Sequence, residues 1–191
     1  MTMTLFASLA LRLRARLATF ADDSRGSVTI EAVIMLPILI WAYCATFVYF
    51  DAYRQTAINE KATYTIADMF SRDTMPVNDA YLDGAYSMLN FLTRSNSDRK
   101  LRVSVIRYDA DEDEYHLQWS KARGPVGPIA DGSKNWRAIL PTMSDEEILI
   151  YVETWTDYDA PFNVGLNDEV TAVKVFTRPR FAPQVLFDNN A

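Results

Sequence analysis

The sequence predicts an α+β protein in which a long N-terminal helix precedes a second helix and an antiparallel sheet of about four strands. Three observations lead to this fold class. An apolar run long enough to cross a membrane lies near the N-terminus, and helical periodicity continues beyond it. Four segments of alternating character, rich in β-branched and aromatic residues, then follow.

The apolar run has nineteen residues without a charge, from Ala32 to Phe50. Counted from Ser27 it has 24 residues, which as a helix cover about 36 Å at roughly 1.5 Å per residue. Its N-terminal flank is rich in arginine, and such flanks stay on the cytoplasmic side; these residues are Arg12, Arg14, Arg16 and Arg25. We therefore expect a basic cytoplasmic leader over residues 1–26, a transmembrane helix over 27–50 and an exported domain over 51–191.

Two other interpretations of the N-terminus fit less well. A secretory signal peptide has a shorter apolar core, of roughly 7–15 residues, and a small-x-small cleavage site after it. The sole cysteine, Cys44, follows Tyr43 where lipoprotein processing requires a small residue. Cys44 is therefore interpreted as a small apolar side chain of the helix, and the exported domain has no thiol.

The long helix is expected to continue into the exported domain with one apolar stripe. The stripe contains Ile58, Ala62, Ile66, Met69 and Phe70, and the residues placed away from it are Asp51, Arg54, Asn59, Glu60 and Lys61. The segment SRDTMPVND predicts the end of this helix, because Pro76 disfavours a helical conformation at Met75. Asn78 can cap a second helix. Its core positions are Leu82, Ala85, Tyr86, Leu89 and Leu92.

Four strands are predicted, over residues 101–108, 114–122, 147–155 and 170–177. The first two form a hairpin around the acidic segment DADEDE. Between the two pairs, residues 123–146 contain Gly and Pro at intervals that exclude long regular structure and predict a loop.

The composition of residues 51–191 argues against nucleic acid as a partner. This part has 15 Lys or Arg against 22 Asp or Glu, a net charge of −7, and no basic patch that would attract phosphate.

The candidate sites of the exported domain each have a simpler structural interpretation. A calcium loop starting at Asp109 would require Gly at Glu114 and Glu at Ser120, so a solvated hairpin tip is favoured. His116 has no partner at a spacing typical of a triad or a metal set. Aromatic residues could line a groove but fit a sheet core better; they are Trp119, Trp136, Trp155, Tyr151 and Tyr158. We expect no metal, no cofactor and no catalytic activity.

The start of the apolar run is distinctive, because Gly26, Ser27, Glu31 and the pair Leu36 and Pro37 occur within a dozen residues. The stretch RGSVTIEAVIMLPILIWA resembles the N-terminal signature of the TadE/TadG-like family, the minor pseudopilins of tight-adherence (Flp-type) pili. The resemblance covers roughly residues 24–55. Ala32 departs from it, because an aromatic residue is common after the glutamate.

The resemblance implies a processing site and a location. A prepilin peptidase at the cytoplasmic membrane face would cut between Gly26 and Ser27, which leaves a pilin-like protein in the bacterial inner membrane with a periplasmic domain. Its partners would be the lipid bilayer, the peptidase, other pilins or pseudopilins and the pilus assembly platform.

Elementary chemistry suggests a role for two further residues of this stretch. The new amine of Ser27 could pair with Glu31 of the same or a neighbouring subunit, which would neutralise a carboxylate that is costly in hydrocarbon. Pro37 removes a helical N–H, so the helix can kink there.

Two alternatives to this interpretation remain open. One is an uncleaved single-pass anchor that carries a periplasmic binding or scaffold module, with the Trp-containing loop from Gly124 to Pro141 as its recognition surface. The other is an enzyme, which would require catalytic groups that converge in a cleft.

Overall fold

The computed structural model describes residues 16, 18–19, 27–94, 99–165 and 169–189. The chain divides into two compact units, Met1–Phe47 and Val48–Ala191. The helix α2, Ser27–Arg72, contributes to both. The second unit has the predicted α+β architecture, with two helices and a four-stranded antiparallel sheet.

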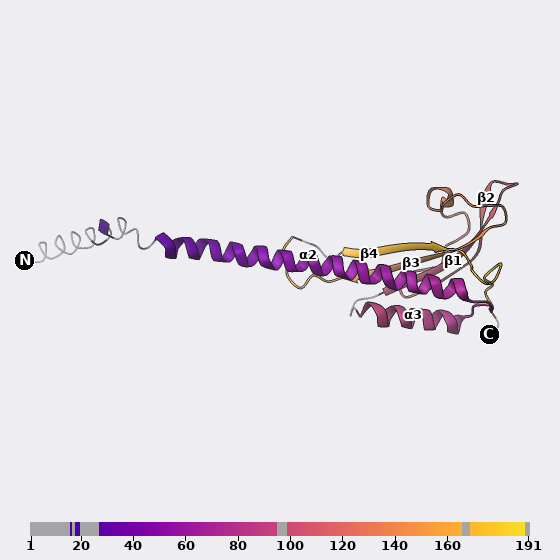
Figure 1. Ribbon diagram of the computed structural model, residues 1–191, viewed down its shortest axis with the longest axis horizontal. Coiled ribbons are helices and arrows are strands. Elements are labelled where there is room, and N and C mark those ends of the chain that lie inside the picture. Colours follow the sequence, from indigo (N-terminus) through magenta and orange to yellow (C-terminus); the bar gives the residue numbers. More distant parts are fainter. Residues whose placement is uncertain (1–15, 17, 20–26, 95–98, 166–168, 190–191) are drawn as a thin grey trace, which may run out of the picture. The chain divides into compact units, whose positions relative to one another are not determined.

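Helix α3, Asp79–Thr93, begins where the sequence places it. The Asn78 side chain accepts a hydrogen bond of 2.9 Å from the Tyr81 N–H, which satisfies one of the free donors of the first helical turn. The helix ends at Arg94, whose φ of 47° is left-handed. Figure 1 shows α3 beside the C-terminal part of α2.

The strands of the sheet are arranged in the order β2-β1-β3-β4. Their bounds are Arg99–Asp109 (β1), Glu114–Arg123 (β2), Ile148–Tyr158 (β3) and Glu169–Thr177 (β4). The β1–β2 hairpin was expected, and the pairing of β1 with β3 places the two longest strands at the centre. Gln118 is an extra residue of β2, because the register with β1 shifts between Val105 and Ile106.

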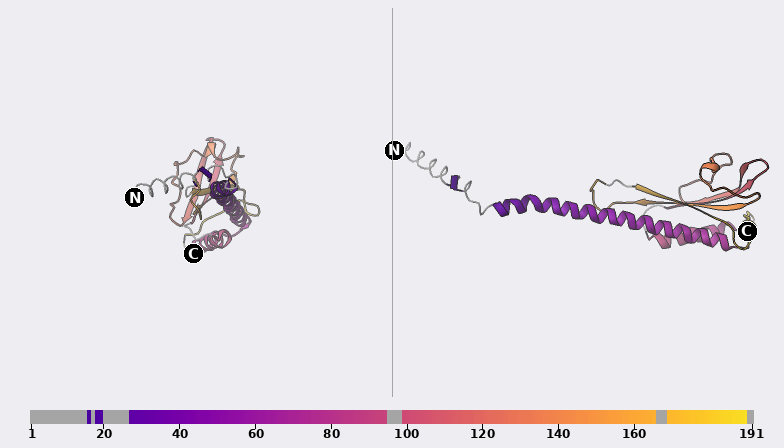
Figure 2. Two further views of the ribbon diagram at one scale, coloured as in Figure 1. Left: turned by 90° about the vertical axis from the view of Figure 1, so that its left-hand side faces the viewer. Right: turned by 45° about the horizontal axis from the view of Figure 1, so that its top comes forward.

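One face of the sheet packs on the two helices, as the right-hand view of Figure 2 shows. Alternate strand residues meet the buried stripes of α2 and α3 there, with Phe70, Leu82 and Leu89 fully buried. The strand residues of this core are Leu101, Val103, Val105, Ile150, Val152 and Val175. Each fully buried side chain of this size contributes roughly 1.5–3 kcal/mol to folding.

The opposite face is covered by the segment between β2 and β3. Its 3₁₀ turn, Trp136–Ala138, and three further apolar side chains form a second core with the sheet. The buried residues of this core are Ile106, Ile129, Trp136, Leu140, Met143, Leu149 and Tyr151. The predicted loop therefore belongs to the folded domain.

The C-terminal segment joins the helices to the edge strand β2. Val77 donates its N–H to the Leu186 carbonyl, and the Trp119 indole N–H donates to the Val185 carbonyl at 2.7 Å. Phe187 packs on the Trp119 ring at 5.3 Å between centroids. No local sequence pattern predicts these contacts of the C-terminal segment.

The prediction that Asn59 lies away from the buried stripe of α2 is wrong. Asn59 is 1% exposed and lies in a polar layer between α2 and the sheet. The Thr154 hydroxyl donates to its amide oxygen at 3.2 Å, and its amide nitrogen donates to the Thr171 carbonyl at 3.3 Å. Thr63 completes the layer, 2.6 Å from the Thr154 hydroxyl. Hydrogen bonding compensates the burial of these groups and sets the position of α2 on the sheet.

Candidate functional site

The candidate processing site lies at the start of α2. Gly26 is outside the described residues, and Ser27 is the first residue of α2. Glu31 follows one helical turn later and is exposed. Because residues four apart are neighbours on a helix, the backbone places Ser27 and Glu31 on one side of α2.

Helix α2 continues through Pro37 without interruption. Proline cannot donate the hydrogen bond that would reach the carbonyl of Val33, so this turn lacks one bond although it keeps its helical form. That Pro37 provides a bending point stays a prediction.

The first half of α2, residues 27–50, exposes large apolar side chains in every direction around the helix, although Val48 near its end is fully buried. Successive helical residues are turned by about 100°, so Val33, Ile34 and Leu39 point in three directions. They are 68%, 58% and 61% exposed. Within the described residues, this is the one helix long and apolar enough to cross a membrane. A surface of this kind requires an apolar environment.

The first charge after the apolar run, Asp51, is linked to the end of β3. The Tyr158 hydroxyl lies 3.2 Å from the Val48 carbonyl oxygen and 3.2 Å from Oδ2 of Asp51. Burial raises the pKa of Tyr158 to about 12, and the negative charge of Asp51 contributes. Tyr158 therefore stays protonated and donates to α2 at neutral pH.

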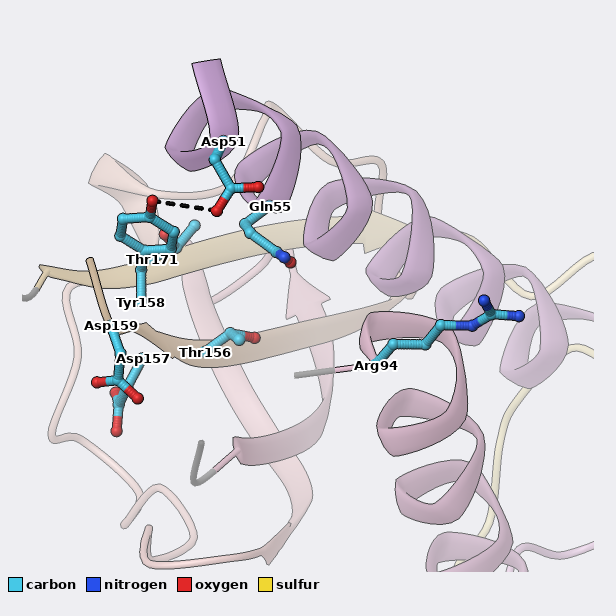
Figure 3. A pocket seen from close by; sticks show the side chains of 8 residues that line it. All are labelled: Asp51, Gln55, Arg94, Thr156, Asp157, Tyr158, Asp159 and Thr171. Atoms are coloured by element: carbon cyan, nitrogen blue, oxygen red, sulfur yellow. Dashed lines mark hydrogen bonds between the residues drawn. The ribbon is translucent and has the colours of Figure 1, made fainter. Parts of the chain in front are cut away.

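Beside this contact lies a polar pocket of about 280 Å³ (Figure 3). Asp51 and Gln55 reach it from α2, Thr156 from β3 and Thr171 from β4. Its other lining residues are Arg94, Asp157, Tyr158 and Asp159. No sequence pattern predicts this site, because its residues come from segments about a hundred positions apart.

The structure places His116 near two carboxylates of the hairpin. Asp109, Glu112 and His116 each offer a ligand atom within 4.8 Å of the others. Asp109 already accepts hydrogen bonds from two N–H groups of the hairpin turn, and Arg107 lies 3.8 Å from its carboxylate. Asp109 thus has a structural role in the turn, and the neighbouring guanidinium opposes the binding of a cation.

The tryptophan of the loop from Gly124 to Pro141 is buried and not exposed to solvent. Trp136 is 4% exposed and packs edge-on against Tyr151, at 5.6 Å between ring centroids. Buried Glu153 holds the loop on the sheet, because it accepts hydrogen bonds from Lys134 at 2.7 Å and from Arg102 at 2.6 Å. An aromatic recognition groove is therefore not formed by this loop.

Comparisons with known proteins add no relative. No family model matches the chain, and neither a curated protein nor a solved structure is significantly similar to it.

Proposed function

We propose that this protein is a minor pseudopilin that takes part in the assembly, initiation or priming of a tight-adherence pilus. It is synthesised with a leader that a prepilin peptidase removes between Gly26 and Ser27. It is held in the bacterial inner membrane by the first half of α2, with residues 51–191 in the periplasm. Its role is structural and not catalytic.

The observation that carries this proposal is the group of features at the start of α2. A basic leader ending in Gly26 precedes α2, and Ser27, Glu31 and Pro37 lie in the first part of this helix, whose apolar side chains are exposed. Glycine at the end of the leader suits cleavage, because an unhindered backbone can enter an active site in extended form. An ordinary signal anchor requires the apolar length but not a glutamate inside it.

Cleavage gives Glu31 a partner of opposite charge. The new ammonium group of Ser27 lies four residues from the carboxylate in the same chain, and equally well meets Glu31 of an adjacent subunit. Either pairing neutralises a charge that is costly in hydrocarbon. The intermolecular pairing would also set the axial position of one subunit against the next.

The exported domain is packed firmly on the second half of α2, so the domain and the helix should move together. Ile66 and Phe70 of α2 are fully buried in the domain, and the Asn59–Thr63–Thr154 layer fixes the helix along its axis. Tyr158 adds a contact at Val48 and Asp51. A force on α2 during assembly would therefore be transmitted to the sheet.

The proposal is tested by the N-terminal sequence and intact mass of the membrane-extracted protein, from cells with and without the cognate peptidase. We expect the mass to fall by that of 26 residues only when the peptidase is present. Gly26→Val should prevent the cleavage. Gly127→Val is the matched control, since an added side chain meets no atom within 4 Å there, and it should be processed normally.

Full-length protein that persists beside an active peptidase would contradict the proposal. The chain would then be an uncleaved anchor for its periplasmic module. Normal cleavage of the Gly26→Val variant would also contradict it, because it would place the processing site elsewhere.

A further inference from the structure

The polar pocket beside Asp51 combines four side chains from three elements. Figure 3 shows Asp51 and Gln55 projecting from α2 toward the strands, with Thr156 below them on β3. Thr171 is the direct cross-strand partner of Thr156. The two threonines therefore lie side by side on the face of the sheet that meets α2.

Thr156 is a buried polar group that lacks a hydrogen-bond partner. It is 6% exposed, and its hydroxyl has no partner within the described part of the chain. Thr154, two residues earlier on the same face, is fully buried but hydrogen-bonded to Asn59. Buried hydroxyls are normally satisfied, so the Thr156 hydroxyl points to a ligand or ordered water in the pocket.

The pocket also has an uncompensated negative charge. Asp51 accepts the Tyr158 hydroxyl but forms no ion pair with any described residue. The guanidinium of Arg94 extends away from Asp51 in Figure 3, although Arg94 lines the pocket rim. Asp157 and Asp159 also line the pocket, but Figure 3 shows their carboxylates pointing away from Asp51.

The arrangement of oxygens distinguishes between two kinds of cation. A divalent metal ion requires several charged oxygens around one point. Among the described residues, Asp51, Asp157 and Asp159 do not bring their carboxylates within 4.8 Å of one another as a metal-binding group does. A primary ammonium requires only three acceptors, and one carboxylate with neighbouring hydroxyl and amide oxygens supplies them.

We propose that this pocket binds a primary ammonium group, with Asp51 as its counter-charge and Thr156 and Gln55 as hydrogen-bond acceptors. The group is supplied by the ethanolamine headgroup of a phospholipid or by a small soluble amine. The headgroup source rests on the proposed membrane anchor, because Asp51 directly follows the uncharged run. A volume of about 280 Å³ accommodates such a group together with water, each water taking about 30 Å³.

The first test uses the full-length protein in nanodiscs of phosphatidylcholine only. Ethylammonium chloride is titrated while the Thr156 backbone amide and the Gln55 side-chain amide are followed by NMR. We expect saturable shifts of both resonances. Tetramethylammonium has the same charge but no N–H donor, and it should bind at least tenfold more weakly. Equal effects of the two cations, or none, would overturn the proposal.

A second arm identifies the source of the ammonium group. Choline and ethanolamine headgroups differ in the methyl groups on nitrogen, so nanodiscs of the two lipids are matched. If the headgroup is the ligand, ethanolamine lipid shifts the same two resonances without added amine. If only the free amine shifts them, the ammonium site is upheld and its ligand is soluble.

Variants then test which residues form the site. Asp51→Asn retains an acceptor for Tyr158 but removes the charge, and Thr156→Val removes a hydroxyl that has no described partner. Each should weaken ethylammonium binding at least tenfold, whereas Asp159→Asn on the rim should change it less than twofold. Binding unchanged in both of the first two variants would overturn the assignment. Leader cleavage is measured separately, so failure of this proposal is distinguishable from failure of the proposed function.

Discussion

The two halves of α2 belong to one continuous helix but bury their side chains in different ways. In the first half, large apolar residues are exposed on all sides, and Phe50 is 71% exposed. In the second half only one stripe is buried, and Phe70, twenty residues later, is fully buried. The first half contains more apolar residues, and yet the second half forms the protein core.

This difference shows that arrangement, and not apolar content, decides where a helix is buried. A helix that is apolar all round has no side suited to water, so its partner is a lipid or another helix of the same kind. An amphipathic helix has one side that fits a sheet and one that faces water. The polar layer at Asn59 adds a fixed position to the second half, which the first half lacks in the described structure.

The largest expected effect is the difference between two identical substitutions, one in each half. Phe70→Ala removes a fully buried ring, and we expect the free energy of unfolding of the domain to fall by about 3–5 kcal/mol. Phe50→Ala should change it by less than about 0.5 kcal/mol. Urea unfolding of the full-length protein in detergent, followed by near-ultraviolet circular dichroism, measures both. Equal losses would remove the distinction between the halves.

A charge at the centre of the first half should reduce insertion. Ile38→Arg places a guanidinium near the centre of the apolar run, which costs about 2.5–3.5 kcal/mol of insertion free energy. The fraction of protein that resists alkaline extraction from membranes should therefore fall. Tyr64→Arg, at a residue of the second half that is 56% exposed, should leave it unchanged. If the extraction-resistant fraction of the Ile38→Arg variant equals that of wild type, this half does not cross the membrane.

The natural carboxylate of the first half should be needed for assembly and not for insertion. Glu31→Gln removes a charge, so insertion and leader cleavage should be intact. If the proposed cleavage and pairing occur, the Ser27 ammonium then lacks its counter-charge, a loss of about 1–3 kcal/mol per contact. We expect reduced co-purification with other pilus components and reduced adhesion.

The control for this prediction is Glu60→Gln, at an exposed glutamate of the second half. Its insertion, leader cleavage, co-purification and adhesion should equal those of wild type. Undiminished co-purification and adhesion of the Glu31→Gln variant would show that Glu31 has no role in assembly.

The smallest effect is expected where the two halves meet. Tyr158→Phe removes the hydroxyl that binds Val48 and Asp51, and the free energy of unfolding should fall by about 0.5–1.5 kcal/mol at neutral pH. Tyr53→Phe, at a residue that is 75% exposed, should have no measurable effect. Thermal unfolding of the two variants beside wild type provides the comparison.

The same variant should change the response to alkali. The pKa of Tyr158 is raised from 10.0 to about 12, so between these values the unfolded state ionises first and stability falls as pH rises. Tyr158→Phe should lose less stability over this interval than wild type. Some loss will remain, because burial also raises the pKa of Tyr81 and Tyr151. If the free energy of unfolding falls equally with pH in Tyr158→Phe and in wild type, the Tyr158 hydroxyl is solvated in the folded protein.

The positions of the elements followed from local signals. Neighbouring residues alone determine three of these features: the apolar run, the end of α2 before Pro76 and the Asn78 cap. All three could therefore be predicted from the sequence. The four strands lie within a few residues of their predicted bounds, because alternation at period two is a property of each segment alone. The junction from Gly26 to Pro37 is equally local.

What the tertiary structure decided was how these elements meet. The pairing of β1 with β3, the loop held by Glu153 and the packing of Phe187 on Trp119 join residues that are far apart in the chain. From the sequence alone Asn59 fits an exposed helix face; in the folded protein it is buried and accepts a hydrogen bond from Thr154. The pocket at Asp51 exists only because β3 and β4 end beside α2. Burial and hydrogen bonding depend on pairs of groups that are distant in the chain. The sequence therefore determined the helices and strands, and only the folded chain determined which residues meet.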